Sequence, residues 1–253
     1  MDLFCLKGKK AIVTGGAKGL GWGMAEGLME YGAQVCIVDI ASNTQEAAEE
    51  FEKRGYVCHG VVADLSQESD LCHGFNEALA FLGGHLDILI NSAGIQRRHL
   101  SEDFPLDDWH EVMNINLHAV FILSQMAGRQ FIMQESKGKI INVASLLSFF
   151  GGYTVPAYAA SKGGVAQLTK ALSNEWSSKG INVNAIAPGY MATELNTALL
   201  ADESRTKQIL ARVPAKRWGT PEDVKGTAIF LASSASDFLC GTVIPVDGGY
   251  MGC

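Results

Sequence analysis

The sequence alternates short apolar runs rich in β-branched residues with longer segments of helical periodicity. Seven such runs occur, at residues 11–13, 35–38, 61–63, 86–90, 139–143, 181–186 and 242–246. Continuous apolar strands that alternate with helices are typical of a parallel sheet covered on both faces, and right-handed crossovers then wind the chain both ways from its first strand. The pattern predicts an α/β fold with a doubly wound, seven-stranded parallel sheet. No linker or internal repeat interrupts residues 1–253, so we expect a single domain.

The composition limits the classes of function open to the chain. A formal net charge of −7 without a basic stripe argues against nucleic acid as a partner. No apolar run reaches the length of about 18 residues that a membrane-spanning helix needs, and the histidines lack the spacing of a metal site. We expect a cytoplasmic protein with no metal and no membrane contact. The six cysteines form no C-x-x-C pair and are expected to be free thiols, at Cys5, Cys36, Cys58, Cys72, Cys240 and Cys253.

A glycine-rich loop follows the first predicted strand and opens the first predicted helix. It reads Thr14-Gly15-Gly16-Ala17-Lys18-Gly19-Leu20-Gly21. Glycines let the backbone approach a pyrophosphate closely, and a helix N-terminus offers it N–H groups and the positive end of a dipole. Asp39 ends the second predicted strand, where a carboxylate accepts hydrogen bonds from an adenosine ribose. The loop and the carboxylate together predict a nicotinamide dinucleotide cofactor on a Rossmann-type fold.

The choice between NAD and NADP depends on two charges near the predicted adenosine end. The carboxylate of Asp39 repels a 2′-phosphate and therefore favours NAD. Lys18 points the other way, since an ammonium group in this loop attracts a phosphate. We give Asp39 the greater weight because its position at the strand end fixes it on the ribose, and we expect NAD.

A second motif, Tyr158-Ala159-Ala160-Ser161-Lys162, follows Pro156 at a predicted helix start. Tyr158 and Lys162 are four residues apart and so share one helix face. A nearby ammonium group stabilises a phenolate, which makes such a tyrosine a sensible general acid and base for an alcohol proton. Ser145 lies 13 residues upstream, past the end of the fifth predicted strand, where its hydroxyl group can orient the substrate oxygen. Taken alone, each of these residues has an ordinary structural reading.

Together these residues resemble the short-chain dehydrogenase/reductase family, and the resemblance runs from Gly8 to Gly249. The matching elements stand in order in the chain: Thr14-Gly15-x-x-x-Gly19-x-Gly21, Asp39, Asp64-Leu65, Asn91-Ser92-Ala93-Gly94, Asn116, Ser145, Tyr158-x-x-x-Lys162, Pro188-Gly189 with Thr193, and Asp247-Gly248-Gly249. Ser92 departs from the Asn that is usual at the second position of the Asn-Asn-Ala-Gly element. The resemblance implies hydride transfer at a secondary alcohol, with Asn116, Ser145, Tyr158 and Lys162 as the catalytic set and Asn116 holding a water in a proton relay to Lys162.

The resemblance also implies which residues contact the cofactor. They are expected to be Gly15, Lys18, Gly19, Leu20, Gly21, Asp39, Ile40, Asp64, Leu65, Asn91, Ala93, Gly94, Tyr158, Lys162, Pro188, Met191 and Thr193. In this assignment Asp64 meets the adenine amino group. The segment 189–221, polar and partly helical after the sixth predicted strand, is expected to be a substrate lid above the carboxyl ends of the strands.

Finer features resemble the members of the family that act on sugar acids, above all on 2-dehydro-3-deoxy-D-gluconate and 2-deoxy-D-gluconate. They are the stretches 95–98, 144–149, 187–193 and 214–221. A sugar acid carries a carboxylate, which an arginine fork binds through two hydrogen bonds. Arg97 and Arg98 follow the fourth predicted strand and suit that role as well as they suit a surface or subunit interface. The expected substrate contacts are Ser145, Leu147, Tyr158, Arg97 and Arg98, whereas Arg217 more often suits a structural role.

Several alternatives share this machinery. Gluconate 5-dehydrogenases and other polyol or steroid dehydrogenases are the nearest. A 3-oxoacyl-carrier-protein reductase is a further one, although Asp39 and the net charge of −7 argue against it, because such enzymes usually favour NADPH and need a basic docking patch. A cofactor-binding scaffold without catalysis is disfavoured by the intact catalytic set. Members of the family are usually tetramers, so the resemblance also implies a homotetramer built through the predicted helices at about 105–134 and 157–179.

Overall fold

The computed structural model of the protein describes residues 2–252, apart from the side chain of Ala198, and leaves Met1 and Cys253 outside the described residues. The strands are β1 Lys10–Thr14, β2 Gln34–Asp39, β3 Cys58–Val62, β4 Ile88–Asn91, β5 Gly138–Val143, β6 Ile181–Pro188 and β7 Val243–Val246. They form one sheet in the order β3-β2-β1-β4-β5-β6-β7, and every neighbouring pair is parallel. This confirms the predicted doubly wound, seven-stranded parallel sheet. β4 begins two residues later than expected, and β6 continues to Pro188.

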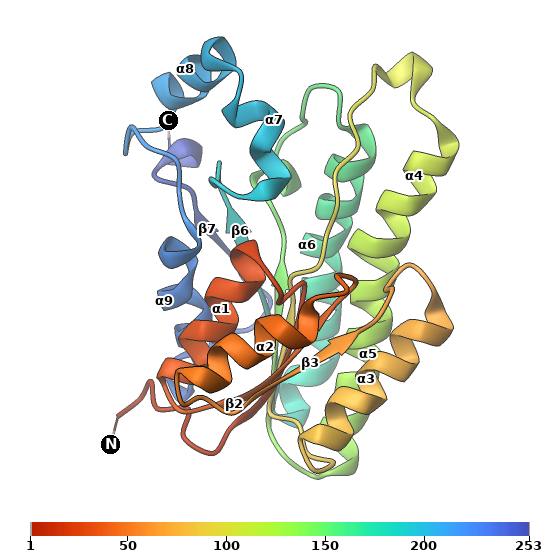
Figure 1. Ribbon diagram of the computed structural model, residues 1–253, viewed down its shortest axis with the longest axis vertical. Coiled ribbons are helices and arrows are strands. Elements are labelled where there is room, and N and C mark those ends of the chain that lie inside the picture. The colour runs from red at the N-terminus through yellow and green to blue at the C-terminus, as the bar shows by residue number, and fades with distance from the viewer. Residues whose placement is uncertain (1, 253) are drawn as a thin grey trace.

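The helices cover both faces of the sheet (Figure 1). Their bounds are α1 Gly19–Glu30, α2 Thr44–Lys53, α3 Glu68–Phe81, α4 Leu106–Met113, α5 Ala119–Met133, α6 Pro156–Trp176, α7 Thr197–Leu200, α8 Glu203–Arg212 and α9 Pro221–Ala232. One apolar core joins α1, α2 and α9 to the sheet through residues such as Leu28, Phe51 and Val224. The other joins α3, α5 and α6 to the opposite face, where Phe75, Phe131 and Leu172 are buried. The strands read as continuous apolar runs because both of their faces are covered.

The register of the sheet brings the carboxyl ends of the central strands together. Thr14, at the end of β1, pairs with Asn91, at the end of β4, and Asn91 in turn pairs with Asn142 of β5. The chain leaves β1, β4, β5 and β6 at this edge, and α7 and α8 lie above it in Figure 1. Ligands of open parallel sheets bind in the crevice outside these carboxyl ends, where the chain winds in opposite directions from neighbouring strands.

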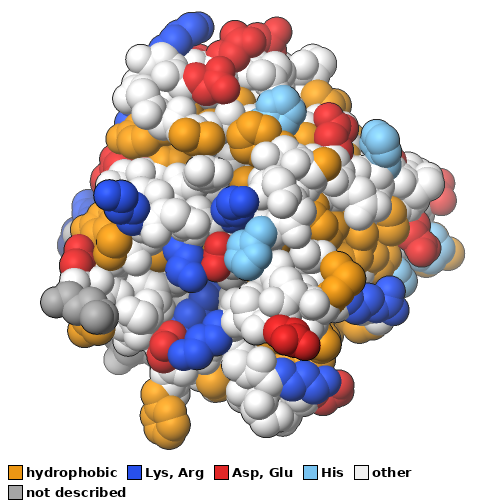
Figure 2. Space-filling model, turned by 90° about the horizontal axis from the view of Figure 1, so that it is seen from below, with side chains coloured by type: hydrophobic (Ala, Val, Ile, Leu, Met, Phe, Trp, Pro, Cys, Tyr) orange, Lys and Arg blue, Asp and Glu red, His pale blue; other side chains and the backbone are white. Residues whose placement is uncertain are grey.

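At the opposite end of the sheet, where the strands begin, lysine side chains form ion pairs with acidic side chains. Figure 2 shows this face, with acidic side chains set among the basic ones. Lys9 donates to Asp87 at 2.9 Å, while Lys139 and Lys137 pair with Asp237 at 2.8 and 3.3 Å. The lysines therefore fix the strand ends to neighbouring loops.

Three further expectations concern the cysteines, metal binding and membrane-spanning helices. Cys5, Cys36, Cys58, Cys72 and Cys240 are free, as expected, and Cys253 lies outside the described residues. Among the residues that the structure describes, no three His, Cys, Asp or Glu side chains are grouped so as to hold a metal ion. Over the same range, none of the helices has the length and apolar character needed to cross a bilayer.

Candidate functional site

The glycine loop between β1 and α1 is packed against the chain that leaves β4. Gly15 has a left-handed φ of 65°, and a Cβ atom there would lie 2.8 Å from the backbone of Ala93. A Cβ atom on Gly21 would lie 2.0 Å from the carbonyl oxygen of Gly15, so α1 closes on its own loop. The Thr14 hydroxyl oxygen accepts hydrogen bonds from the N–H groups of Ser92 and Ala93, at 3.1 and 3.2 Å. Side chains are thus excluded where a phosphate must meet backbone N–H groups.

A cavity of about 470 Å³ extends from this loop along the carboxyl ends of the strands. Most of the residues expected to contact a cofactor line it: Gly15, Lys18, Gly19, Leu20, Gly21, Asp39, Ile40, Asp64, Leu65, Ala93, Gly94, Tyr158, Lys162, Pro188, Met191 and Thr193. The lining also includes residues that the sequence did not single out, among them Ile115, Glu194 and Asn196. The cavity suits a nicotinamide dinucleotide. It combines the glycines of the loop, which carry no side chains, the N-terminus of α1 and, at its far end, the carboxylate of Asp39.

Asn91 is the exception among the expected cofactor contacts. Its side chain points into the protein, where its amide group donates to Ser124 Oγ at 3.1 Å and to Asn142 Oδ1 at 2.9 Å. The residue is 2% exposed and does not line the cavity. In a fully buried strand, alternate side chains point to opposite faces of the sheet. The match of Asn91 to a sequence motif therefore does not tell which face its side chain points to. Its side chain joins β4 to β5 and α5.

The end of the cavity that contains Asp39 carries more negative charge than the sequence suggested. Asp39 is buried, and its carboxylate accepts from the N–H groups of Ala17 and Ala41 at 3.1 and 3.2 Å. Lys18 forms an ion pair with Glu194, which comes from the segment after β6. This pairing raises the pKa of Lys18 and neutralises its charge locally. Glu194 could not be foreseen because it is 176 residues away in sequence.

Ser145 is held in place by the turn in which it lies. It caps the short 3-10 helix Leu146–Ser148, its hydroxyl accepting from the N–H of Leu147 at 3.1 Å. Ser148 accepts from the Ser145 N–H and donates to the carbonyl oxygen of Lys162, which ties this turn to α6. The Ser145 hydroxyl group lies beside the phenol of Tyr158, lines the same cavity and lowers the pKa of Tyr158. Burial has the larger effect and leaves the pKa of the phenol above its usual value.

Lys162 is 3% exposed, and its ammonium group donates to the carbonyl oxygen of Val143 at 2.7 Å. Burial lowers the pKa of this ammonium group to about 8. The nitrogen lies 5.7 Å from the centre of the Tyr158 ring, so the two residues share one helix face, as their spacing predicted. Its charge therefore acts on the phenol at short range, within a poorly solvated site.

Asn116 lies in a π-helical turn, Asn114–His118, between α4 and α5. Its side chain exchanges two hydrogen bonds of 2.9 Å with the backbone of Ile95 and donates to Ser161 Oγ at 3.2 Å. A Cβ atom on Gly94 would lie 3.2 Å from Asn116 Oδ1 and 3.6 Å from Lys162 Nζ, so both groups adjoin that glycine. Single-turn π segments are frequent at functional sites. Here the turn holds the chain after β4 against α6.

A second pocket, of about 100 Å³, adjoins the large cavity and shares Ser145, Tyr158 and Asn196 with it. Arg98 and Leu147, two of the residues predicted to contact the substrate, also line it. Arg97 does not. Its guanidinium group lies 2.8 Å from a carboxylate oxygen of Glu111 and 3.8 Å from Asp108, both on α4. The structure therefore separates two adjacent arginines that the sequence left equivalent.

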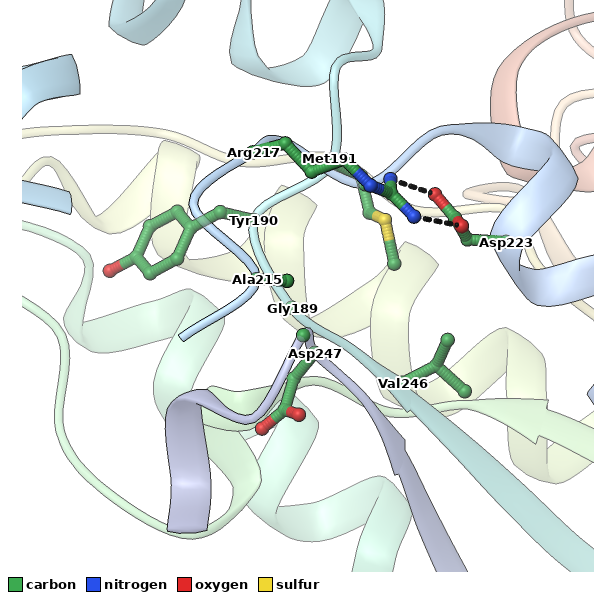
Figure 3. A pocket seen from close by; sticks show the side chains of 10 residues that line it. Gly189, Tyr190, Met191, Ala215, Arg217, Asp223, Val246 and Asp247 are labelled. Atoms are coloured by element: carbon green, nitrogen blue, oxygen red, sulfur yellow. Dashed lines mark hydrogen bonds and ion pairs between the residues drawn. The ribbon is translucent and has the colours of Figure 1, made fainter. Parts of the chain in front are cut away.

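A third cavity, of about 200 Å³, lies where β6 and β7 end, and Figure 3 shows its lining. Arg217 makes two hydrogen bonds of 2.7 Å to the carboxylate of Asp223. Asp223 also accepts from the Thr220 N–H and completes a capping box at the start of α9. Arg217 thus has the structural role that its sequence context favoured, and its charge is already paired.

Comparison with known proteins agrees with this geometry. A family model described as enoyl-(acyl carrier protein) reductase matches residues 15–251. The 2-dehydro-3-deoxy-D-gluconate 5-dehydrogenase of Bacillus subtilis (strain 168) is 46% identical over 250 residues, which cover 99% of this chain and 97% of the relative. The enzyme of the same name from Escherichia coli (strain K12) is 47% identical over 251 residues, covering 99% and 98%.

Among solved structures, a gluconate 5-dehydrogenase from Burkholderia cenocepacia J2315, in complex with NADP and tartrate, matches with a TM-score of 0.95. It is 40% identical, and the match covers 100% of this chain and 98% of that one. The resemblance seen in the motifs thus extends over the whole chain and over the whole fold. The chain belongs to the short-chain dehydrogenase/reductase family.

Proposed function

We propose that this protein interconverts a secondary alcohol and a ketone on a sugar acid, with NAD as its preferred cofactor. The substrates proposed first are 2-dehydro-3-deoxy-D-gluconate and 2-deoxy-D-gluconate. The observation that carries the proposal is that Ser145 and Tyr158 line both the large cavity and the smaller pocket that contains Arg98. A proton-transfer pair thus lies where a cofactor cavity meets a pocket suited to an anion.

Each catalytic side chain has a distinct role in this proposal. The nicotinamide ring, when bound, accepts or donates the hydride. The Ser145 hydroxyl orients the substrate oxygen, and Tyr158 takes its proton in oxidation or returns it in reduction. The Lys162 ammonium group stabilises the phenolate form of Tyr158. Asn116 is proposed to hold the water through which the proton reaches solvent, while its side chain fixes the loop after β4 against Ser161.

The NAD preference rests on the charges around the adenosine end. Asp39 and Asp64 line the cavity there, and the cation of Lys18 is paired with Glu194. A 2′-phosphate would enter a region with no free cation among these residues, at an electrostatic cost. The related Burkholderia structure holds NADP. The preference proposed here therefore depends on the side chains at this end of the cavity and is independent of the fold.

The sugar-acid substrate is supported by three observations. The relatives that match along the whole chain bear the names of gluconate or deoxygluconate enzymes. The Burkholderia relative is in complex with tartrate, a hydroxy acid. Arg98 offers a guanidinium group beside Tyr158. Residues 189–221, which contain α7 and α8, are proposed to act as a lid over this pocket. The homotetramer and the cytoplasmic location remain predictions.

A substrate panel tests the proposal. Turnover is followed by the absorbance of the reduced cofactor, with NAD and NADP in parallel for the substrates that are oxidised and with NADH and NADPH in parallel for the ketones that are reduced. The panel contains 2-dehydro-3-deoxy-D-gluconate, 2-deoxy-D-gluconate, D-gluconate and its 5-keto form, the uncharged polyol D-glucitol and a 3-oxoacyl thioester. We expect the highest kcat/KM for a deoxygluconate with NAD. Activity on the polyol or the thioester without activity on any sugar acid would overturn the substrate class, and a preference for NADP would overturn the cofactor choice.

A further inference from the structure

The small pocket beside Ser145 and Tyr158 is lined by two arginines that come from distant parts of the chain. Arg98 follows β4, and Arg205 lies in the first turns of α8. Among the described residues that line this pocket, none is an aspartate or a glutamate. The remaining polar side chains include Gln96, Tyr190 and Asn196. The pocket therefore carries positive charge that the protein itself does not balance.

Arg98 and Arg205 differ from two other arginines near the site, which form ion pairs with acidic side chains. Arg97 pairs with Glu111, and Arg217 pairs with Asp223. The hydrogen bonds described for the guanidinium groups of Arg98 and Arg205 run instead to the neutral side chains of Gln96, at 3.4 Å, and Gln208, at 3.2 Å. Within residues 2–252, neither of the two has an ion pair with an acid at 4.0 Å or less.

The charges of Arg98 and Arg205 are also close enough to disfavour each other. The pKa of Arg98 is lowered, first by partial burial and then by the positive charge of Arg205. Two like charges that face one pocket repel each other, and an anion that enters the pocket lowers the electrostatic free energy of the pair. Arg98 also interacts electrostatically with Tyr158, so the positive charge extends to the proton-transfer group.

The position of Arg205 is set by the packing of α8. Four residues further along the helix, Ile209 is buried in one apolar cluster with Leu146, which follows Ser145 in the chain. Residues four apart share a helix face, and Ile209 and Arg205 both line the small pocket, so the burial of Ile209 in this cluster directs Arg205 toward it. Arg205 and Lys207 are both exposed, but only Arg205 lines the pocket. Asp202 caps the helix by accepting from the Arg205 N–H at 2.9 Å.

We propose that Arg205 is a substrate-binding residue that holds the carboxylate of the sugar acid together with Arg98. This inference rests on the proposed function and deepens it, because it names the group of the substrate that the lid recognises. A carboxylate has two oxygen atoms with several acceptor sites, and two guanidinium groups that line one pocket can share it. An uncharged polyol would leave both arginines unbalanced.

Binding of an acid between the two arginines would favour closure of the segment 189–221 over the pocket. Arg205 lies on α8, within the segment 189–221, whereas Arg98 belongs to the loop after β4. An anion between them attracts the helix toward the body of the enzyme, and the binding free energy of the substrate's charge then favours the arrangement in which the pocket is covered. A neutral analogue lacks this contribution.

Four variants test the proposal: Arg205→Gln, Arg98→Gln, Arg205→Lys and the matched control Lys207→Gln on the same helix. For each, kcat and KM are measured with the best sugar acid of the panel and with D-glucitol. We expect Arg205→Gln to raise KM for the acid by about 10- to 100-fold, as for the loss of a charged hydrogen bond, with kcat nearly unchanged. KM for D-glucitol should not rise. Arg205→Lys should restore part of the affinity, and Lys207→Gln should resemble the wild type.

A binding measurement separates failure of this inference from failure of the proposed function. Calorimetric titration of tartrate into the enzyme saturated with NADH requires no turnover. We expect binding in the wild type and in Lys207→Gln and a loss of at least about tenfold in Arg205→Gln and Arg98→Gln. If Arg205→Gln matches Lys207→Gln in both assays, Arg205 does not hold the carboxylate. If the wild type turns over no sugar acid, the proposed substrate class fails, and tartrate binding decides by itself whether the two arginines form an anion site.

Discussion

Lys162 donates its hydrogen bond of 2.7 Å to the carbonyl oxygen of Val143, the last residue of β5. The bond joins α6 to the strand end that leads directly into Ser145. Because Tyr158 lies one turn before Lys162 on the same helix, this one contact fixes both the tyrosine and its cation against the serine. The cost is a buried ammonium group whose pKa is about 8.

That cost predicts how the stability of the protein depends on pH. The pKa of Lys162 is about 8 in the fold and has an ordinary value of 10.5, so the unfolded chain binds more protons between these pH values. Stability from this group therefore rises as pH increases from about 8 towards 10.5. Methionine does not titrate. The unfolding free energy of Lys162→Met minus that of the wild type should fall by about 2–3 kcal/mol between pH 7 and pH 10. Urea denaturation at both pH values measures it, and a constant difference would contradict the buried charge.

Tyr158→Phe should abolish turnover while the protein still binds NADH. The phenol is the acid and base of the proposed reaction, and general acid–base catalysis contributes roughly 10²–10⁴-fold. We expect kcat to fall by at least about 10²-fold, with the dissociation constant of NADH changed by less than about threefold. Single-turnover absorbance and a fluorescence titration measure the two quantities. Appreciable turnover by this variant would remove Tyr158 from its role.

The two directions of the reaction should respond oppositely to pH. Burial keeps the pKa of Tyr158 above its usual value, so the neutral phenol dominates near neutral pH. Oxidation needs the phenolate, and its kcat/KM should rise with pH, whereas reduction uses the phenol and should fall at alkaline pH. The Ser145 hydroxyl group lowers the pKa of Tyr158. Ser145→Ala should therefore shift the rising limb of the oxidation profile to higher pH, in addition to lowering the rate. An unshifted profile would show that Ser145 does not tune the pKa of Tyr158.

Glu194→Gln should weaken the preference for NAD. Glu194 forms an ion pair with Lys18 at the rim of the cofactor cavity, and the glutamine leaves the ammonium group free to meet a 2′-phosphate. Because both side chains are exposed, the effect is modest: kcat/KM with NADP should rise by about two- to tenfold, while that with NAD changes little. Glu203→Gln, at the start of α8, is the matched control. No gain with NADP would show that the pair does not govern this choice.

Asp223→Asn should destabilise the fold without changing the site chemistry. The carboxylate receives two hydrogen bonds from Arg217 and one from the Thr220 N–H at the start of α9. Loss of a helix cap costs about 1 kcal/mol, and we expect a total of roughly 1–2 kcal/mol. The thermal midpoint of unfolding should fall by a few degrees. A midpoint equal to that of the wild type would mean that water replaces the carboxylate at no cost.

The order of elements in the chain determined the fold. Buried strands must be apolar on both faces, and the crossovers between parallel strands must be helical, so the sheet could be predicted from the sequence. The glycine loop, Asp39 and the Tyr158–Lys162 pair could be predicted for a related reason. Each is a local pattern whose geometry is fixed by one turn or by one helix face. The structure places them around one cavity.

Only the tertiary structure decided which way the side chains point and which residues distant in the sequence they contact. The sequence could not tell Arg97 from Arg98, because only the packing of α4 supplies Glu111 and Asp108 to one of them. It could not show that Asn91 faces the core, nor that Glu194 reaches Lys18. Arg205 gave no signal in the sequence, since its place beside Arg98 arises from the docking of α8 through Ile209. The local sequence determines the backbone conformation and which chemical groups are present. The role of a charged side chain depends on the groups that folding places next to it.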